Sequence, residues 1–367
     1  MAQKALTDAQ CAEAADAYRI HGEKRAAARS LGLHESTLAF RLKEAQVRGL
    51  DKSKPKLPDF GEEDLPVEEL IEIASRRFEK RQAHSQQKDW FDISMQTDEP
   101  CLIALVGDPH LDDDGCNWPL LTRDVELMAN TPNVFAINLG DSSNNWVGRL
   151  TRLYAAQEAS KGTGYKYVKW FMHQSGINWL LWLLGNHDEW NDGALVIREM
   201  SSNTVKIFDW QSKFNLVFPN RRRCPMWVAH SFKGNSMYNI LHGAMRSIKF
   251  GTVIVRIAAQ GHHHEWGLFV TEDGDTHLTT HAIKARGYKH IDHFAERHMF
   301  TNQNLGSTMA VVIDPRVEET HPNFINVFPD LGVGVNYLHA LCDAGFSDTQ
   351  NVQDIDNKEN RESRKRS

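Results

Sequence analysis

Five short apolar runs that each end before a metal-ligating side chain constrain this sequence more than any other feature. The first run, at residues 101–106, is followed by Asp108 and His110. A short apolar run rich in β-branched residues indicates a buried strand, and α/β sheets place their sites at the carboxyl ends of strands. The other four runs, at residues 134–137, 179–183, 226–229 and 254–259, precede Asp141, Asn186, His230, and the pair His262 and His264. Two later apolar runs, at 309–313 and 324–328, are expected to be further strands. The pattern predicts an α/β fold in which these side chains converge.

The chemical types of these side chains indicate which metals could bind. A single histidine is usually an ordinary polar residue, but here O and N donors recur after each apolar run, and none of them is a cysteine. Carboxylate and amide oxygens mixed with imidazole suit Mn, Fe, Zn or Mg, whereas thiolates would indicate structural zinc. We therefore expect a site for divalent metal ions.

The same side chains carry a resemblance to a known family, the calcineurin-like metallophosphoesterases. The resemblance covers about residues 100–285 and includes every ligand position of that family. Its five motifs are Asp108-x-His110, Gly140-Asp141, Gly185-Asn186-His187-Asp188, His230 and Gly261-His262-x-His264. The resemblance implies a four-layer αββα sandwich whose loops hold two metal ions, with Mn as the first expectation and Fe, Zn or Mg as alternatives.

The resemblance also implies how the ligands divide between the two metals. One metal is expected to be held by Asp108, His110 and His264. The other is expected to be held by Asn186, His230 and His262. Asp141 would bridge the two. Two cations that share a carboxylate can lower the pKa of a common water and neutralise charge on the phosphoryl oxygens.

Three further residues lie within the motifs without being expected as ligands. In the family, the histidine at the position of His187 contacts the phosphate or protonates the leaving oxygen, and Asp188 is expected to orient it. These two are the predicted catalytic residues. His263 occupies the variable position of its motif and is expected to point away from the metals.

Two segments near the ligands are candidates for substrate binding. Lys233 and Arg246 follow His230 in a run of side-chain donors and are expected to position phosphate. Residues 142–174 interleave basic and aromatic side chains, a pattern that suits a nucleic-acid strand. Helix packing beneath a lysine-rich exterior explains that second segment nearly as well.

Residues 1–50 are predicted to form a small three-helix unit that resembles a helix-turn-helix. The expected helices cover about residues 8–20, 23–31 and 35–48, with Gly32 in the turn. In such a unit Ser36, Thr37 and Arg41 would face base edges, and Lys24 and Arg25 would meet phosphates. Eight basic minus six acidic residues give this segment a charge of only +2. A protein-interaction or oligomerisation module is the alternative.

The remaining chain divides by composition. We expect a linker and spacer helix at 51–87, the phosphoesterase domain at 88–346, and a disordered charged tail at 347–367. Overall, the net charge of −6 gives no global nucleic-acid signature. The five cysteines form no CxxC pair, which favours a reducing compartment. Because no signal peptide or membrane-length apolar run is visible, a cytoplasmic protein without membrane contact is expected.

The expected function follows from this combination of modules. A helix-turn-helix joined to this domain resembles phage-type calcineurin-like DNA exonucleases and repair nucleases, which implies phosphodiester hydrolysis of DNA. The alternative is a phosphomonoesterase or small-nucleotide phosphodiesterase whose N-terminal unit recruits or dimerises. A DNA-binding regulator with an inactive metal fold would be expected to lack a ligand, and none is missing. The sequence leaves the native metal, the cleavage polarity and the oligomeric state open.

Overall fold

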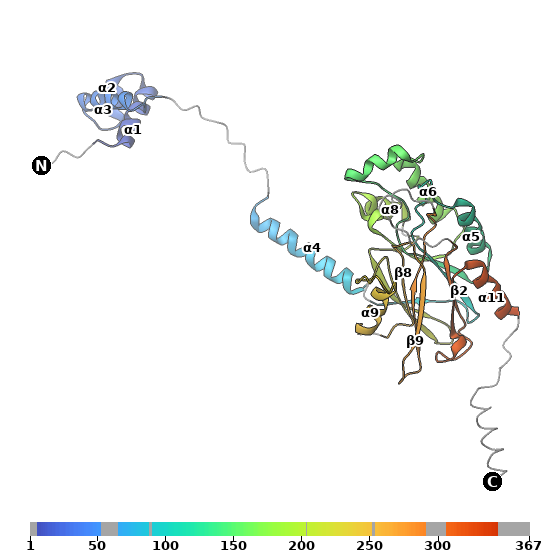
Figure 1. Ribbon diagram of the computed structural model, residues 1–367. Coiled ribbons are helices and arrows are strands. Elements are labelled where there is room, and N and C mark those ends of the chain that lie inside the picture. Colours follow the sequence, from blue (N-terminus) through green and yellow to red (C-terminus); the bar gives the residue numbers. More distant parts are fainter. Residues whose placement is uncertain are drawn as a thin grey trace, which may run out of the picture. The chain divides into compact units, whose positions relative to one another are not determined.

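The computed structural model describes residues 6–52, 65–87, 90–202, 204–251, 254–290 and 306–343, in two units, Met1–Arg76 and Arg77–Ser367 (Figure 1). Most of the predicted linker, residues 53–64, lies outside the described residues, and so does the predicted tail at 347–367.

The first unit contains three short helices at the predicted positions. They are α1 (Asp8–His21), α2 (Lys24–Ser30) and α3 (Glu35–Val47). Thr7 caps α1 through a reciprocal pair of hydrogen bonds with Gln10, which satisfies main-chain donors at the helix start. The core consists mainly of small side chains, among them Ala14 and Ala27, around the buried Leu38. Small residues allow such short helices to pack closely.

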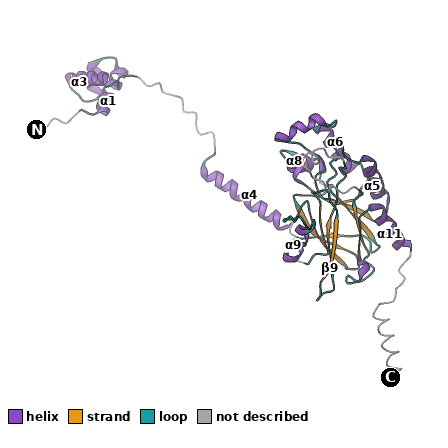
Figure 2. Cartoon of the chain, viewed as in Figure 1, coloured by secondary structure: helices purple, strands orange, loops and turns teal. Residues whose placement is uncertain are grey.

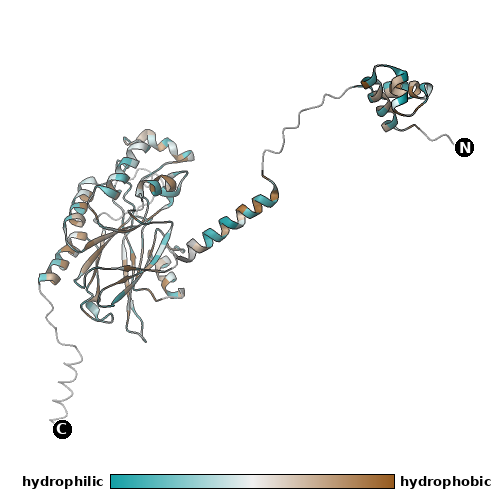
Figure 3. Ribbon diagram, turned by 180° about the vertical axis from the view of Figure 1, so that it is seen from behind, coloured by the Kyte–Doolittle hydropathy of each residue, from teal (hydrophilic) through white to brown (hydrophobic). Residues whose placement is uncertain are grey.

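Helix α4 (Val67–Gln87) begins directly after Pro66, whose main-chain oxygen accepts a hydrogen bond from Leu70 N at 3.1 Å. Its apolar residues recur at helical spacing, and Figure 3 shows brown bands alternating with teal along it. Ile71 and Phe78 of this stripe are exposed.

One six-stranded sheet carries the first three motifs. Its order is β12-β11-β2-β3-β4-β5, in which β2 to β5 are parallel and β11 is antiparallel to both neighbours. The strands are β2 (Cys101–Val106), β3 (Val134–Asn138), β4 (Trp179–Leu183), β5 (Ile207–Phe208), β11 (Met309–Ile313) and β12 (Ile325–Phe328). The central strands β2 and β11 are buried along their whole length, as expected for strands covered on both faces.

The second six-stranded sheet carries the other two motifs. Its order is β1-β6-β7-β8-β10-β9, with β7, β8 and β10 parallel to one another and β6 antiparallel to β7. The strands are β1 (Phe91–Ser94), β6 (Gln211–Val217), β7 (Arg223–Ala229), β8 (Ile257–Gln260), β9 (Gly267–Glu272) and β10 (Thr279–Lys284). In the run predicted at 254–259 the strand starts only at Ile257; Ile254 before it is exposed.

The main hydrophobic core joins buried side chains of the two sheets, whose strands are orange in Figure 2. It combines Ile103 and Leu181 of the first sheet with Phe214 and Ile257 of the second. A second cluster packs α5 (Trp118–Asn130), α6 (Lys161–His173), α8 (Gly193–Ser201) and α11 (Leu331–Asp343) on the first sheet. A smaller cluster packs α9 (His242–Phe250) on the second sheet. The predicted α/β class is therefore confirmed.

Short helical segments complete the described chain: η1 (Gly148–Ala156), α7 (Asn186–Glu189) and η2 (Pro322–Phe324). Within the described residues, every helix is too short or too polar to cross a membrane.

Candidate metal centre

The carboxyl ends of five strands, three from one sheet and two from the other, bring the predicted ligands together. β2, β3 and β4 run parallel in the first sheet, and β7 and β8 run parallel in the second. Parallel strands place their carboxyl ends at one edge, where loops can assemble a site. The predicted ligands that follow these strands adopt positive φ at five positions: Asp108, His110, Asp141, His262 and His264. Such conformations are costly for non-glycine residues and cluster at functional sites.

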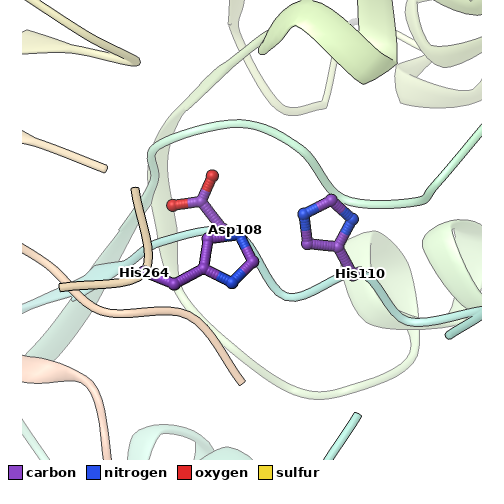
Figure 4. A group of neighbouring side chains, drawn as sticks. All are labelled: Asp108, His110 and His264. Atoms are coloured by element: carbon purple, nitrogen blue, oxygen red, sulfur yellow. The ribbon is translucent and has the colours of Figure 1, made fainter. Parts of the chain in front are cut away.

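A first group consists of Asp108, His110 and His264. Each offers one ligand atom, and these atoms lie within 4.8 Å of one another. Figure 4 shows the Asp108 carboxylate beside the His264 ring, with the His110 ring across from them. One carboxylate oxygen of Asp108, Oδ2, accepts a hydrogen bond from the main-chain N of His262 at 2.6 Å. That bond fixes the carboxylate and leaves Oδ1 for another partner.

A second group consists of Asp141, His230 and His262, again with ligand atoms within 4.8 Å of one another. The Nε2 atom of His230 lies 2.9 Å from His262 Nδ1 and 3.4 Å from Asp141 Oδ2. It also lies 3.0 Å from the side-chain oxygen of Asn186. His230 Nδ1 donates to the main-chain oxygen of Leu139 at 2.8 Å, which fixes the ring and directs Nε2 to the group.

Asp141 lies between the two groups. Its carboxylate belongs to the second group and also lies within 4.8 Å of ligand atoms of His110 and His187. Asp141 Oδ1 accepts a hydrogen bond from the main-chain N of His187 at 2.9 Å. Two glycines permit this approach. A Cβ on Gly185 would stand against Asp141 Oδ1 and 2.6 Å from its main-chain N, and Gly140 has φ +102°, which strains other residues.

The electrostatics of the site fit a bound cation. Burial raises the pKa of Asp108 to about 7, since no neighbouring positive charge compensates fully for lost water. Burial opposes ionisation of Asp141 as well, but the surrounding imidazoles, His230 first among them, hold its pKa well below the usual range. Burial lowers the pKa of His262 to about 3, and the neighbouring His230 contributes. Burial lowers the pKa of His230, but the Asp141 carboxylate outweighs it and raises that pKa to about 9. Because metal ligands must be deprotonated, a cation that binds here would displace protons from His230 and Asp108.

Two buried polar atoms without hydrogen-bond partners also bear on whether a metal ion fits this site. Asp108 Oδ1 and His110 Nδ1 are buried and find no hydrogen-bond partner among the described residues. Buried polar atoms without partners are rare, and a bound ion is one of their ordinary explanations. Among the described residues, side chains close enough to hold a metal ion are therefore present, and their nitrogen and oxygen donors suit Mn, Fe or Zn.

The predicted catalytic pair is organised differently from the expectation. His187 Nδ1 donates to the main-chain oxygen of Asn144 at 2.6 Å, and its Nε2 lies 4.0 Å from Asp141 Oδ2. Asp188 instead accepts hydrogen bonds from the main-chain N atoms of Gly185 and Ser142, at 3.0 and 3.1 Å. The orienting role assigned to Asp188 therefore falls to the Asn144 carbonyl, and Asp188 fixes the loops that hold Asp141.

Aromatic side chains surround His187, and sequence reasoning did not identify all of them. The ring of Trp190 lies 4.2 Å from that of His187, and Trp146 lies 5.2 Å away. Trp190 is the residue that caps α7, three positions after His187, and this short spacing could have identified it. Trp210, 5.0 Å from His230, gave no such local signal.

The predicted phosphate-positioning residues lie outside the two ligand groups. Lys233 lines a pocket of about 570 Å³ that His262 also lines. Arg246 is exposed on α9, and its Cδ lies 3.6 Å from a Cβ built on Gly234, next to Lys233. His263, the predicted bystander, is exposed and lines the same pocket.

The predicted DNA-contacting residues all lie in the first unit. Lys24 and Arg25 open α2 and are exposed. Ser36 and Thr37 are exposed in the first turn of α3, and Arg41 follows one turn later. Thr37 and Arg41 share one face of α3, since residues four apart lie on the same helix face, and Ser36 adjoins that face.

Comparison with known proteins identifies no family. No protein-family model and no curated protein matches the chain. Among solved structures it is similar to one titled "GAP50 the anchor in the inner membrane complex of Plasmodium", with 11% sequence identity and a TM-score of 0.30. The similarity covers 66% of this chain and 94% of that chain. A likeness of this strength identifies neither a family nor a function.

Proposed function

We propose that the protein is a metal-dependent phosphoesterase of the calcineurin-like type, with the four-layer αββα sandwich of that family, and that it hydrolyses phosphodiester bonds in DNA. The observation that carries the proposal is the position of Asp141. Its carboxylate has an atom within 4.8 Å of ligand atoms of His110 on one side and of His230 and His262 on the other. A carboxylate so placed suits a pair of cations.

The proposed ligands follow from the two groups. One divalent ion would be held by Asp108, His110 and His264. Its partner would be held by Asn186, His230 and His262, with Asp141 shared. When bound, two such ions supply a hydroxide near neutral pH and neutralise charge on the phosphoryl oxygens, and Mn is the first metal to test.

The chain's own residues would position the substrate and move a proton. His187 is fixed through Nδ1 by the Asn144 carbonyl, so Nε2 is the nitrogen available to the leaving oxygen. Burial lowers the pKa of His187, and a phosphate beside Nε2 would counter this by favouring the protonated ring. Trp146 and Trp190 flank the ring and exclude water from it.

DNA as the substrate is supported by the first unit. Ser36 and Thr37 are exposed in the first turn of α3 and the half-buried Arg41 follows them, in the part of the helix that would enter the major groove. Lys24 and Arg25, exposed at the start of α2, would meet phosphates. This arrangement resembles that of phage-type nucleases that join a helix-turn-helix to a phosphoesterase.

The test compares three substrate classes with the full chain and added Mn²⁺: p-nitrophenyl phosphate, bis-p-nitrophenyl phosphate, and labelled linear and circular DNA. We expect hydrolysis of the diester and of DNA, and loss of both in Asp141→Asn. Hydrolysis of the small esters without any DNA cleavage would favour the phosphomonoesterase or small-nucleotide alternative. Absence of hydrolysis on every substrate, with Mn²⁺, Fe²⁺, Zn²⁺ or Mg²⁺, would refute the proposal.

A further inference from the structure

A pocket adjoins the candidate metal centre on the side of the second sheet. It has a volume of about 570 Å³ and is lined by residues from the β6–β7 hairpin, the loop after His230, and α9. His262, a predicted metal ligand, forms part of its wall. Pockets of this size hold small organic ligands in many proteins. A molecule bound at the metals could therefore extend into the pocket without leaving the site.

Trp210 forms the wall shared by the pocket and the metal centre. The β6–β7 register places it opposite His230, whose main-chain N donates to Trp210 O at 2.8 Å. Its indole Nε1 donates to Ser231 O at 2.7 Å, which fixes the ring. The Trp210 ring lies 5.0 Å from that of His230 and 6.4 Å from that of His262. A planar aromatic surface is thus held immediately beside two predicted ligands.

Trp227 supplies a second fixed indole. Its Nε1 donates to Gln211 Oε1 at 2.9 Å, and its ring packs edge-to-face with Phe232 at 5.1 Å. The ammonium of Lys213, its cross-strand partner, lies 4.7 Å from the ring centre. These contacts hold the indole in one orientation, so it can receive a planar ligand without first losing conformational freedom.

Apart from Phe232 and Gly234, the other lining residues have polar side chains, and one of them, Lys233, is a lysine. Lys233 is exposed at the rim, and Asn235 and Ser247 line the pocket with hydrogen-bonding side chains. A ligand that matches this wall combines a flat aromatic ring, polar ring-edge atoms and an adjoining anion. A nucleobase joined to a phosphate has all three.

We propose that this pocket binds the base of the nucleotide whose phosphate lies at the metal centre, an inference that rests on the proposed phosphodiesterase function. Trp210 and Trp227 supply the aromatic surfaces, Asn235 and Ser247 meet polar atoms of the base edge, and Lys233 meets the neighbouring phosphate. Base–aromatic contact of this kind tolerates every base, because every base has a π-face.

One consequence concerns the form of the DNA. A base can enter a pocket only when it is unpaired and unstacked, and removing a base from a duplex carries a free-energy cost. The enzyme is therefore expected to act on single-stranded DNA or on frayed ends in preference to intact duplex.

The test measures what the base adds to binding. Isothermal titration calorimetry gives the Kd of thymidine 5′-monophosphate and of 2-deoxyribose 5-phosphate for the full chain, first in EDTA, where no metal-dependent turnover occurs, and then with Mn²⁺. We expect the nucleotide to bind about tenfold more tightly than the sugar phosphate, in line with the strength of base–aromatic stacking. Trp210→Leu and Trp227→Leu should each remove most of this preference, and Trp210→Phe should keep most of it.

Controls make the result decisive. Trp118→Leu alters an indole that packs on Tyr167 in the helix layer of the other sheet, and the preference should survive. Circular dichroism checks that each variant is folded. Equal binding of the two ligands by the unmodified chain would overturn the inference, as would a preference that persists in both Leu variants. Phenyl phosphate binding as tightly as the nucleotide would also overturn it, since the pocket would then accept any aryl phosphate.

The two proposals can fail separately. Base preference without any ester hydrolysis would retain the nucleotide pocket and refute the phosphoesterase. Diester hydrolysis without base preference would retain the phosphoesterase and refute the pocket assignment.

Discussion

Replacing Asp108 with asparagine is expected to stabilise the metal-free second unit at alkaline pH while abolishing its stabilisation by metal. Asp108 is fully buried, and only one of its oxygens has a hydrogen-bond partner among the described residues. Burial raises its pKa from the ordinary 3.8 to about 7, while His230 opposes the rise and Asp141 adds to it. The ionised carboxylate of Asp108 therefore lowers the stability of the folded second unit unless a bound cation neutralises its charge.

The sign and size of the effect follow from linkage. The folded pKa lies above the unfolded one, so the stability that protonated Asp108 contributes is complete below about pH 4. That stability is lost as the pH rises through 7. A rise in the pKa of Asp108 from 3.8 to about 7 corresponds to about 4 kcal/mol of folding free energy, because each pKa unit is worth about 1.4 kcal/mol. This figure is an upper limit, because the ionisation of Asp108 also depends on the charges of Asp141 and His230. Asparagine does not titrate, and its oxygen can still accept from His262.

Thermal unfolding followed by tryptophan fluorescence measures this effect. All ten tryptophans lie between Trp90 and Trp266, so the signal reports the second unit alone. In EDTA, the unfolding temperature of the unmodified chain should decrease as the pH is raised from 5 to 8. Relative to the unfolding temperature of Asp108→Asn, this decrease should reach up to about 10 °C. Mn²⁺ should raise the midpoint of the unmodified chain and leave that of the variant unchanged.

The control is Asp275→Asn, which alters an exposed carboxyl in the turn after β9. Its pH profile should match that of the unmodified chain. Identical pH profiles for the Asp108 variant and the unmodified chain in EDTA would refute the electrostatic reasoning. Full stabilisation of that variant by Mn²⁺ would refute the assignment of Asp108 as a ligand.

Three further variants test other parts of the proposal. His187→Gln should slow diester hydrolysis by a factor of about 10² to 10⁴, as expected when a general acid is lost, and Mn²⁺ binding measured by calorimetry should be retained. Loss of Mn²⁺ binding would instead show that His187 is a ligand. Gly185→Ala should weaken Mn²⁺ binding at least tenfold, because the added Cβ meets the Asp141 carboxylate between the two groups. Gly274→Ala should leave Mn²⁺ binding unchanged, because a Cβ there has nothing within 4 Å. Equal Mn²⁺ affinities of the two variants would contradict the close approach of Gly185 to Asp141. Lys24→Ala combined with Arg41→Ala should reduce DNA binding by the full chain and flatten its dependence on salt; unchanged binding in a filter or anisotropy assay would assign the first unit to another partner.

Several strands could be predicted from the sequence because their local signal is complete. The apolar runs at 101–106, 179–183 and 309–313 coincide with β2, β4 and β11, which are wholly or largely buried. Strands with one polar face were missed. β6 alternates buried and less buried residues over Gln211–Val217, a period-two pattern that could have identified it. β9 is exposed at the sheet edge and carries almost no burial signal.

The sequence by itself determined which donor types follow which strands, and through the family resemblance it indicated a dimetal centre. The order of residues does not show how those donors group: the resemblance implied a division, and the packing of the two sheets produces the groups found in the tertiary structure. His262 lies with His230, whereas His264, two residues later, lies with Asp108 and His110. The grouping depends on how two sheets pack across a shared core, and residue order along one strand does not encode that. For the same reason, the Asn144 carbonyl that orients His187 was invisible to sequence reasoning, since every residue carries a carbonyl and only the fold brings this one within 2.6 Å.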